Sequence, residues 1–197
     1  MQSVYRAIGI AMLMAAPAVA QSKPQTREGF TIGFGLGVGS AGVSCDQCSK
    51  DRANSGAGYL RIGGTVRPNL IIAGESQGWA KRIEDGNNTE DITIGALLAV
   101  AVWYPSTTGG FYLKGGLGGG SITDDINVPP FSAKLESTGL AVTFGAGYDF
   151  RVGKNFSLSP YLSWFGTGGA KAKVNGSSSN EKLNANLFQL GLGFTWH

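Results

Sequence analysis

Charge is scarce in this sequence: Asp, Glu, Lys and Arg make up only 15% of its residues, and the formal net charge is +3. One of the basic residues, Arg6, lies near the start of the chain. Such a small and scattered excess argues against the basic surface that binds nucleic acid, so no nucleic-acid partner is expected. The low charge and the 42% share of hydrophobic residues also argue against intrinsic disorder.

Long apolar runs are missing beyond the first twenty residues. There, Arg6 precedes the short apolar stretch 7–16, and Ala18-Val19-Ala20 has the form of a signal-peptidase site. The stretch is too short to cross a bilayer as a helix. We therefore expect residues 1–20 to be a signal peptide that exports the chain, and residues 21–29 to be a short periplasmic segment before a single domain over residues 30–197.

Histidine and cysteine are nearly absent, with one His and two Cys. The lone His197 is at the chain end, so no Ser-His-acid set is expected near the polar segments, and neither an enzyme nor a cofactor is predicted. Cys45 and Cys48 suggest a redox or zinc site, but the βαβ setting of a redox motif and the four ligands of a structural zinc site are missing. A local disulfide in an oxidising compartment is favoured, and no metal site is predicted.

Alternation with period two is the strongest positive feature. At the end of the chain, large apolar residues alternate with small or polar ones, which places the two sets on opposite faces of a β-strand. The apolar set is Phe188, Leu190, Leu192, Phe194 and Trp196. The same pattern predicts eight strands, over Phe30–Ala41, Gly58–Val66, Leu70–Ala80, Asp91–Tyr104, Phe111–Ile122, Gly139–Val152, Phe156–Gly168 and Asn184–Trp196.

The connections between these strands alternate in length. Tight turns at 67–69, 105–110 and 153–155 contain Pro, Gly or Asn, which suit turn backbone. Longer polar segments cover 42–57, 81–90, 123–138 and 169–183. Short turns at one end and long loops at the other are typical of an up-and-down β-barrel in an outer membrane.

The position of the charges tests this prediction. If the alternating apolar residues face lipid, the strand charges fall on the opposite, inner face. The expected lipid face includes Phe34, Leu36, Leu60, Ile72, Ile92, Ile94, Leu98, Val100, Val102, Leu117, Phe144 and Leu162, and the expected inner charges are Arg61, Glu75, Lys114, Asp149 and Arg151. A soluble barrel with reversed faces also separates the charges, but its water-facing surface would then consist largely of glycine, as at Gly33, Gly35, Gly37 and Gly39. The membrane barrel is therefore favoured.

Pro160 cannot donate to a ladder, so a bulge is expected in the seventh strand.

These features resemble the small eight-stranded outer-membrane β-barrels, similar to the barrel domain of outer membrane protein A. The resemblance rests on the export signal, the strand count, the alternation of loop lengths and the aromatic C-terminal strand. It implies location in the cell outer membrane. It also implies that Phe188, Phe194 and Trp196 form the signal read by the barrel-assembly machinery.

An eight-stranded barrel is just wide enough to be filled by side chains, so its inner charges must be paired. Arg61 and Glu75 lie symmetrically about the turn at Pro68 and are expected to form one pair. Lys114 and Asp149 are expected to form a second. The inward tyrosines are expected to lie across the glycine-lined wall with their hydroxyls on these charges; they are Tyr59, Tyr112 and Tyr161.

Two further groups are expected at the membrane boundaries. Trp79, Trp103, Trp164 and Trp196 lie near strand ends and fit an interfacial aromatic girdle. The charged loop residues would engage lipopolysaccharide or simply lie in solvent; they include Lys81, Arg82, Glu84, Asp85, Glu90, Asp91, Asp124, Asp125 and Lys134.

The sequence thus predicts a monomeric, non-catalytic barrel with a sealed, charged interior that acts structurally or through its surface loops. The alternative is a narrow channel of low conductance for small solutes or ions. An enzyme acting on membrane lipid is the third class considered.

Overall fold

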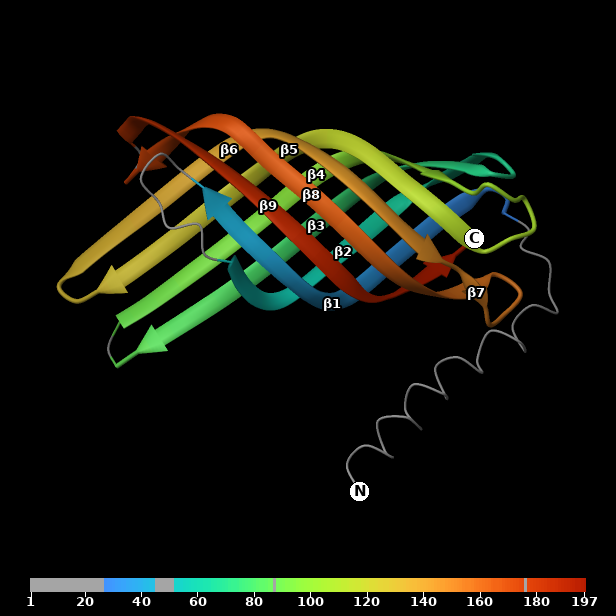
Figure 1. The fold of residues 1–197 in the computed structure, drawn as a ribbon, viewed down its shortest axis with the longest axis horizontal. Coiled ribbons are helices and arrows are strands. Elements are labelled where there is room, and N and C mark those ends of the chain that lie inside the picture. Colours follow the sequence, from blue (N-terminus) through green and yellow to red (C-terminus); the bar gives the residue numbers. More distant parts are fainter. Residues whose placement is uncertain (1–26, 45–51, 87, 176) are drawn as a thin grey trace, which may run out of the picture.

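The computed structural model describes residues 27–44, 52–86, 88–175 and 177–197, and it consists of long antiparallel strands (Figure 1). The predicted signal peptide at 1–20, Cys45 and Cys48 lie outside the described residues. The strands are β1 (Phe30–Ser44), β2 (Arg52–Arg67), β3 (Leu70–Asp85), β4 (Asn88–Trp103), β5 (Phe111–Val128), β6 (Phe131–Tyr148), β7 (Phe150–Arg151), β8 (Phe156–Val174) and β9 (Ser177–Trp196). In the part of the chain that is described, no helix has the length and apolar character needed to cross a membrane.

The sheet closes on itself. Apart from the short β7, each strand pairs with its neighbours in sequence, β6 pairs with β8, and β1 pairs with β9 from Ile32↔Trp196 to Ser44↔Asn184. The short β7 continues β6 along the same partner, β8. The result is an eight-stranded, up-and-down antiparallel barrel with tilted strands, as predicted (Figure 1).

Pro160 is accommodated differently from the prediction. The β8–β9 ladder passes through Pro160↔Leu192 without a shift, so the expected bulge at this position is wrong. The pairing is interrupted instead on the other side of β8, where the ladder with β6 ends at Gly147↔Tyr161 and the ladder with β7 resumes at Phe150↔Leu158. The register is the same on both sides of this gap. Because proline has no N–H to donate, the ladder opposite it breaks, and this break divides β6 from β7.

The predicted long loops are largely strand. The β3–β4 hairpin remains paired as far as Asp85↔Asn88, and the β5–β6 hairpin as far as Val128↔Phe131. A strand of about 9–11 residues crosses a bilayer, whereas these strands have 16–18 residues. In the outer parts, apolar side chains such as Ile92 and Ile122 lie on the inner face among many polar residues, so the lipid-facing alternation that identifies the strands stops there, although the backbone groups still pair along the hairpin.

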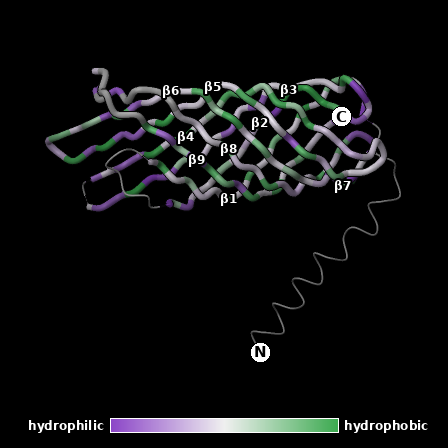
Figure 2. Tube along the Cα trace, turned by 45° about the horizontal axis from the view of Figure 1, so that its top comes forward, coloured by the Kyte–Doolittle hydropathy of each residue, from purple (hydrophilic) through white to green (hydrophobic). Residues whose placement is uncertain are grey.

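Outward apolar side chains form a belt around the half of the barrel that contains the short turns. They include Phe34, Leu36, Leu60, Ile62, Ile72, Leu97, Leu117, Leu140, Phe144, Leu162, Leu190 and Leu192, all of which are exposed. The predicted lipid face is therefore correct for most strands. Hydrophilic segments are frequent in the hairpins at the other end (Figure 2).

The lipid face predicted for the fourth strand is wrong. Ile94, Leu98, Val100 and Val102 are buried inside the barrel, while Leu97 is 71% exposed on the outside. Both faces of β4 are apolar, so its own alternation does not mark the inner one. The pairing Glu75↔Leu98 decides the orientation, because it aligns Leu98 with an inward charge on β3.

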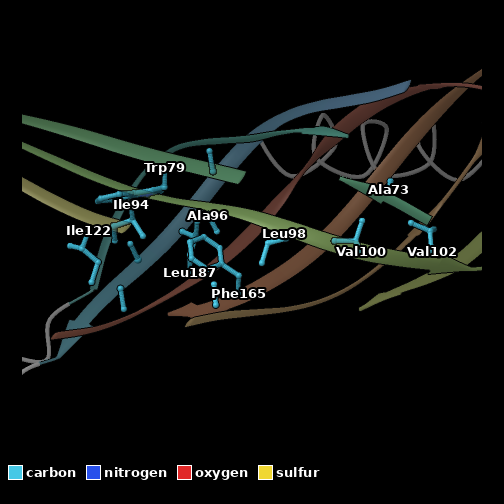
Figure 3. Packing of buried hydrophobic residues seen from close by; sticks show 14 of the residues in the cluster. Ala73, Trp79, Ile94, Ala96, Leu98, Val100, Val102, Ile122, Phe165 and Leu187 are labelled. Carbon is cyan, nitrogen blue, oxygen red and sulfur yellow. The ribbon is translucent and has the colours of Figure 1, made fainter. Parts of the chain in front are cut away.

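The interior changes character along the barrel axis. At the level of the apolar belt it holds the buried charges, whereas beyond the belt it is lined by Trp79, Ile94 and Ile122, which form part of a buried hydrophobic cluster (Figure 3). Beyond the belt the outer wall carries exposed Asn54, Thr93 and Ser121. A wall that faces water needs an apolar core, and a wall that faces lipid does not. The strands therefore exchange their apolar and polar faces where they pass the belt.

Candidate functional site: the interior charge network

Glu75 is at the centre of the interior network. Its carboxylate is fully buried and accepts hydrogen bonds from Arg61 Nε at 2.6 Å, Lys114 Nζ at 2.6 Å and Gln77 Nε2 at 2.5 Å. The Gln77 amide also donates to the Thr143 hydroxyl at 3.1 Å. These side chains come from β2, β3, β5 and β6, so the network crosses the lumen and ties half of the wall together.

The position of Arg61 follows from local sequence. The tight turn between β2 and β3 sets the register Arg61↔Glu75, which puts both residues on the inner face. The guanidinium of Arg61 also lies over the Tyr59 ring, 4.9 Å from its centroid. A cation above an aromatic face gains a further electrostatic contact, so Arg61 has a charge partner and a ring partner in the same layer.

Lys114 does not pair with Asp149, and that predicted ion pair is wrong. Lys114 lies opposite Gly145 in the β5–β6 register, and Asp149 is four residues further along the chain. At about 3.3 Å per residue, this offset places Asp149 near the short-turn end, out of reach of the amine. Lys114 instead shares the carboxylate of Glu75 with Arg61. Two cations thus converge on one anion.

Asp149 belongs to a second cluster at the short-turn end. It accepts hydrogen bonds from the Tyr104 hydroxyl at 2.8 Å and the Ser159 hydroxyl at 2.6 Å, and His197 Nε2 is 3.5 Å away. Arg27 lies over the Tyr104 ring, 3.4 Å from its centroid, and donates to the carbonyl oxygen of Gly109 at 2.6 Å.

Arg151 and Arg27, which precedes β1, complete this cluster. Arg151 is buried, and its guanidinium donates to the Lys154 carbonyl oxygen at 3.1 Å in the turn after β7. Arg27 is 1% exposed, so residues 27–29 of the predicted periplasmic segment reach the end of the barrel instead of remaining outside it. The short-turn end is thus closed by side chains from both ends of the domain.

The inner tyrosines lie against glycine, as the pattern suggests. The Tyr59 and Tyr161 rings meet edge to face at 4.9 Å between centroids. Their hydroxyls, however, are buried without a hydrogen-bond partner among the described residues, so the predicted bonds from these two hydroxyls to the charges are wrong. The Tyr59 ring serves as a face for Arg61 instead.

Gly35 lies in close contact with both of these rings. A Cβ added there would lie 2.5 Å from Cε1 of Tyr59 and 2.8 Å from Cε1 of Tyr161. We expect Gly35→Ala to lower the free energy of unfolding by about 1–3 kcal/mol, the usual cost of overpacking. Gly78→Ala is the matched control, since a Cβ at Gly78 meets nothing within 4 Å. Urea unfolding in lipid vesicles measures both, and equal values would show that the rings do not set the cost.

The tryptophans divide between the two faces. Trp103 and Trp196 are exposed on the outside, and Trp164 also faces outward, stacked on Phe144 with the ring centroids 6.1 Å apart. Trp79 does not belong to the girdle: it is 2% exposed and donates its indole N–H to the Gly39 carbonyl oxygen inside the barrel at 3.0 Å. Trp79 follows Glu75 by four residues, an even number, so the two side chains lie on the same face of β3, and this spacing was the available signal for an inward position.

The residues proposed as the assembly signal share one face. Phe188, Phe194 and Trp196 alternate along β9 and point outward, and Phe194 packs against Phe34 and Phe156 with centroid distances of 5.3 and 5.5 Å. Phe188 and Trp196 are exposed. The structure thus presents these rings on the lipid side of the strand that closes the barrel.

Sequence reasoning missed several members of the two clusters: Arg27, Gln77, Tyr104, Thr143, Ser159 and His197. Gln77 could have been found, because it follows Glu75 by two positions on the inner face. Arg27 has no such signal, since it precedes the first strand and its position depends on contacts with the turn after β4.

Comparisons with known proteins agree with this architecture. The family model for the outer membrane protein beta-barrel domain matches residues 8–195. A search of curated proteins gave no match.

Among solved structures, the chain is similar to Ail, the attachment invasion locus protein of Yersinia pestis. The identity is 18%, the match covers 84% of this chain and 99% of Ail, and the TM-score is 0.53. For Ail in complex with the heparin analogue sucrose octasulfate the TM-score is 0.56. Neisserial surface protein A is 15% identical, with 87% of this chain and 99% of that chain covered and a TM-score of 0.53. At these identities the likeness concerns the fold. The family model matches almost the whole chain, and the chain forms a closed barrel. The chain therefore belongs to the outer membrane protein beta-barrel domain family.

Proposed function

We propose that this protein is a non-catalytic barrel of the cell outer membrane whose interior is sealed and whose role is structural or exerted through its projecting hairpins. The observation that carries the proposal is the succession of buried layers along the lumen. Tyr104 and Asp149 close the short-turn end, the Glu75 network fills the middle, and Phe165 and Leu187 lie beyond it, all at most 6% exposed. A lumen blocked by these layers leaves the outer end of the barrel and its hairpins as the part available to partners.

The chemistry of the hairpins supports lipopolysaccharide as a partner. Exposed Arg82 pairs with Glu84 at 2.8 Å, and exposed Lys134 with Glu136 at 2.8 Å. Exposed pairs of this kind contribute little to stability, so their cations can exchange a carboxylate for a phosphate at small cost. The outward aromatic residues of β9 support recognition by the barrel-assembly machinery, and the closed ladder supports a monomer, since it leaves no strand edge for a second copy.

The second candidate is a narrow channel of low conductance. It is favoured by buried polar atoms that have no hydrogen-bond partner among the described residues: the Tyr59 and Tyr161 hydroxyls and both atoms of the Gln189 amide. Buried polar groups are usually partnered by protein or water. These atoms lie in the same part of the lumen as the charges and would line a narrow water path.

Single-channel recording of the refolded mature protein separates the two candidates. The sealed barrel is expected to show no discrete openings in planar bilayers with lipopolysaccharide in one leaflet, because water and ions cannot pass the buried layers. A porin recorded under the same conditions provides the positive control. Discrete openings of the wild-type protein would overturn the sealed barrel and establish the channel.

A further inference from the structure

The outer end of the lumen contains a cavity that the sealed-barrel function does not use. It has a volume of about 250 Å³ and is lined by Trp79 and Ile94 beyond the apolar belt; both side chains are labelled in Figure 3. Nine of its lining residues are apolar or aromatic, and the tenth is an acid: Ala41, Val43, Ala53, Trp79, Ile92, Ile94, Ile122, Leu135, Leu183 and Asp124.

The size and lining of the cavity define an apolar guest. An apolar core beyond the lipid belt explains why these side chains point inward, but it does not explain why the core remains unfilled, since protein interiors normally pack closely. An apolar cavity of about 150 Å³ accepts benzene in another protein. The present cavity therefore suits a compact molecule of about ten carbon atoms, with Trp79 as an aromatic wall.

Asp124 adds one polar requirement. Its Oδ1 is buried and has no hydrogen-bond partner among the described residues. Burial raises the pKa of this carboxyl, and the neighbouring Glu90 and Asp125 raise it further. An unpartnered acceptor next to two more carboxylates favours a guest that donates a proton in a hydrogen bond, above all a cationic one.

Among the described side chains, no rim cation donates a hydrogen bond to this acceptor. Lys134 is engaged by Glu136 at 2.8 Å. Lys81 lies in the same row as Asp124, since Lys81 pairs with Ile92 and Ile92 with Asp124. Two strand spacings separate these backbones, about 10 Å. The Lys81 amine does not hydrogen-bond to Asp124 Oδ1 across this span, whereas a guest in the cavity lies directly beside the carboxylate.

We propose that this cavity is a binding site for a small amphipathic molecule, a primary amine on a compact apolar body, with its ammonium group on Asp124 and its body against Trp79, Ile94 and Ile122.

Three probes of similar size test the site: 1-naphthylmethylamine, 1-methylnaphthalene and 1-naphthoate. The isotope-labelled isoleucine methyl groups of the full barrel in lipid nanodiscs provide the readout by NMR. Binding in the cavity is expected to shift the inward Ile92, Ile94 and Ile122 and to leave the outward Ile32, Ile62 and Ile72 unchanged. Partition into lipid would shift the outward set, and shifts confined to that set would overturn the proposal.

The order of affinities tests the role of Asp124. We expect the amine to bind at least about tenfold more tightly than 1-methylnaphthalene, in line with a hydrogen bond to a charged group, and the naphthoate to bind more weakly than either. Asp124→Asn is expected to reduce the preference for the amine to about threefold or less while 1-methylnaphthalene still binds. Equal affinities for the three probes in the wild-type protein would overturn the assignment of an amine.

A variant that fills the cavity completes the test. Ala53→Phe adds a ring to the lining and is expected to abolish the inward isoleucine shifts. Ala80→Phe adds the same ring to the outer face of the neighbouring strand, where Ala80 is exposed, and should leave binding unchanged. Heat-modifiable mobility in electrophoresis establishes that both variants fold. Binding that survives in folded Ala53→Phe would place the guest elsewhere and overturn the proposal.

Discussion

Glu75→Ala is expected to lower the free energy of unfolding by about 3–5 kcal/mol, because it leaves buried cations without their anion. The carboxylate of Glu75 is the acceptor shared by Arg61 and Lys114, each at 2.6 Å, and all three side chains are at most 5% exposed. Urea unfolding of the refolded barrel in lipid vesicles, followed by tryptophan fluorescence, measures the loss.

Lys114→Met is the matched comparison. It removes one of the two cations and leaves Arg61 and Glu75 as a neutral pair, so its loss should be clearly smaller than that of Glu75→Ala. If the two variants lose the same free energy of unfolding, the loss is caused by packing and not by unpaired charge. A folded Glu75→Ala barrel should also be recorded in planar bilayers, since openings that appear only in this variant identify the network as the seal.

Phe34→Arg is expected to cost at least about 2–4 kcal/mol, the penalty for a basic residue near the middle of the lipid-facing wall. Phe34 points outward from β1, is 49% exposed and packs on Phe194. Thr93→Arg is the control: Thr93 is also outward and exposed, but it lies beyond the apolar belt on β4. The free energy of unfolding of this control variant should change by no more than about 0.5 kcal/mol, as is usual for surface substitutions.

The same unfolding assay in vesicles compares these two arginine variants. An equal loss at both positions would mean that lipid contacts extend to Thr93 and would contradict the exchange of apolar and polar faces beyond the belt. A loss at Phe34 alone locates the upper boundary of the lipid contact between the two positions.

Alternation along single strands was enough to predict the barrel. In β1 and β9, large apolar side chains alternate with glycine or polar residues, so only one face is suited to lipid and the inner face follows. The symmetric positions of Arg61 and Glu75 about a tight turn also predict that they lie opposite each other, because a short hairpin fixes its own register.

Tertiary structure decided what a single strand does not encode. Both faces of β4 are apolar, so only its pairing with β3 turned Leu98 inward and Leu97 outward. The partner of Lys114 depended on the register between strands, which brought its amine to Glu75 and left Asp149 with Tyr104 and Ser159.

The sequence by itself determined a closed, lipid-facing barrel with an inner row of charges, because that information repeats every two residues within each strand. The closure of the short-turn end by Arg27 and His197 and the apolar cavity beside Asp124 were decided only by the folded chain. These features arise from residues far apart in sequence that the tilt and register of the strands bring to the same level of the lumen.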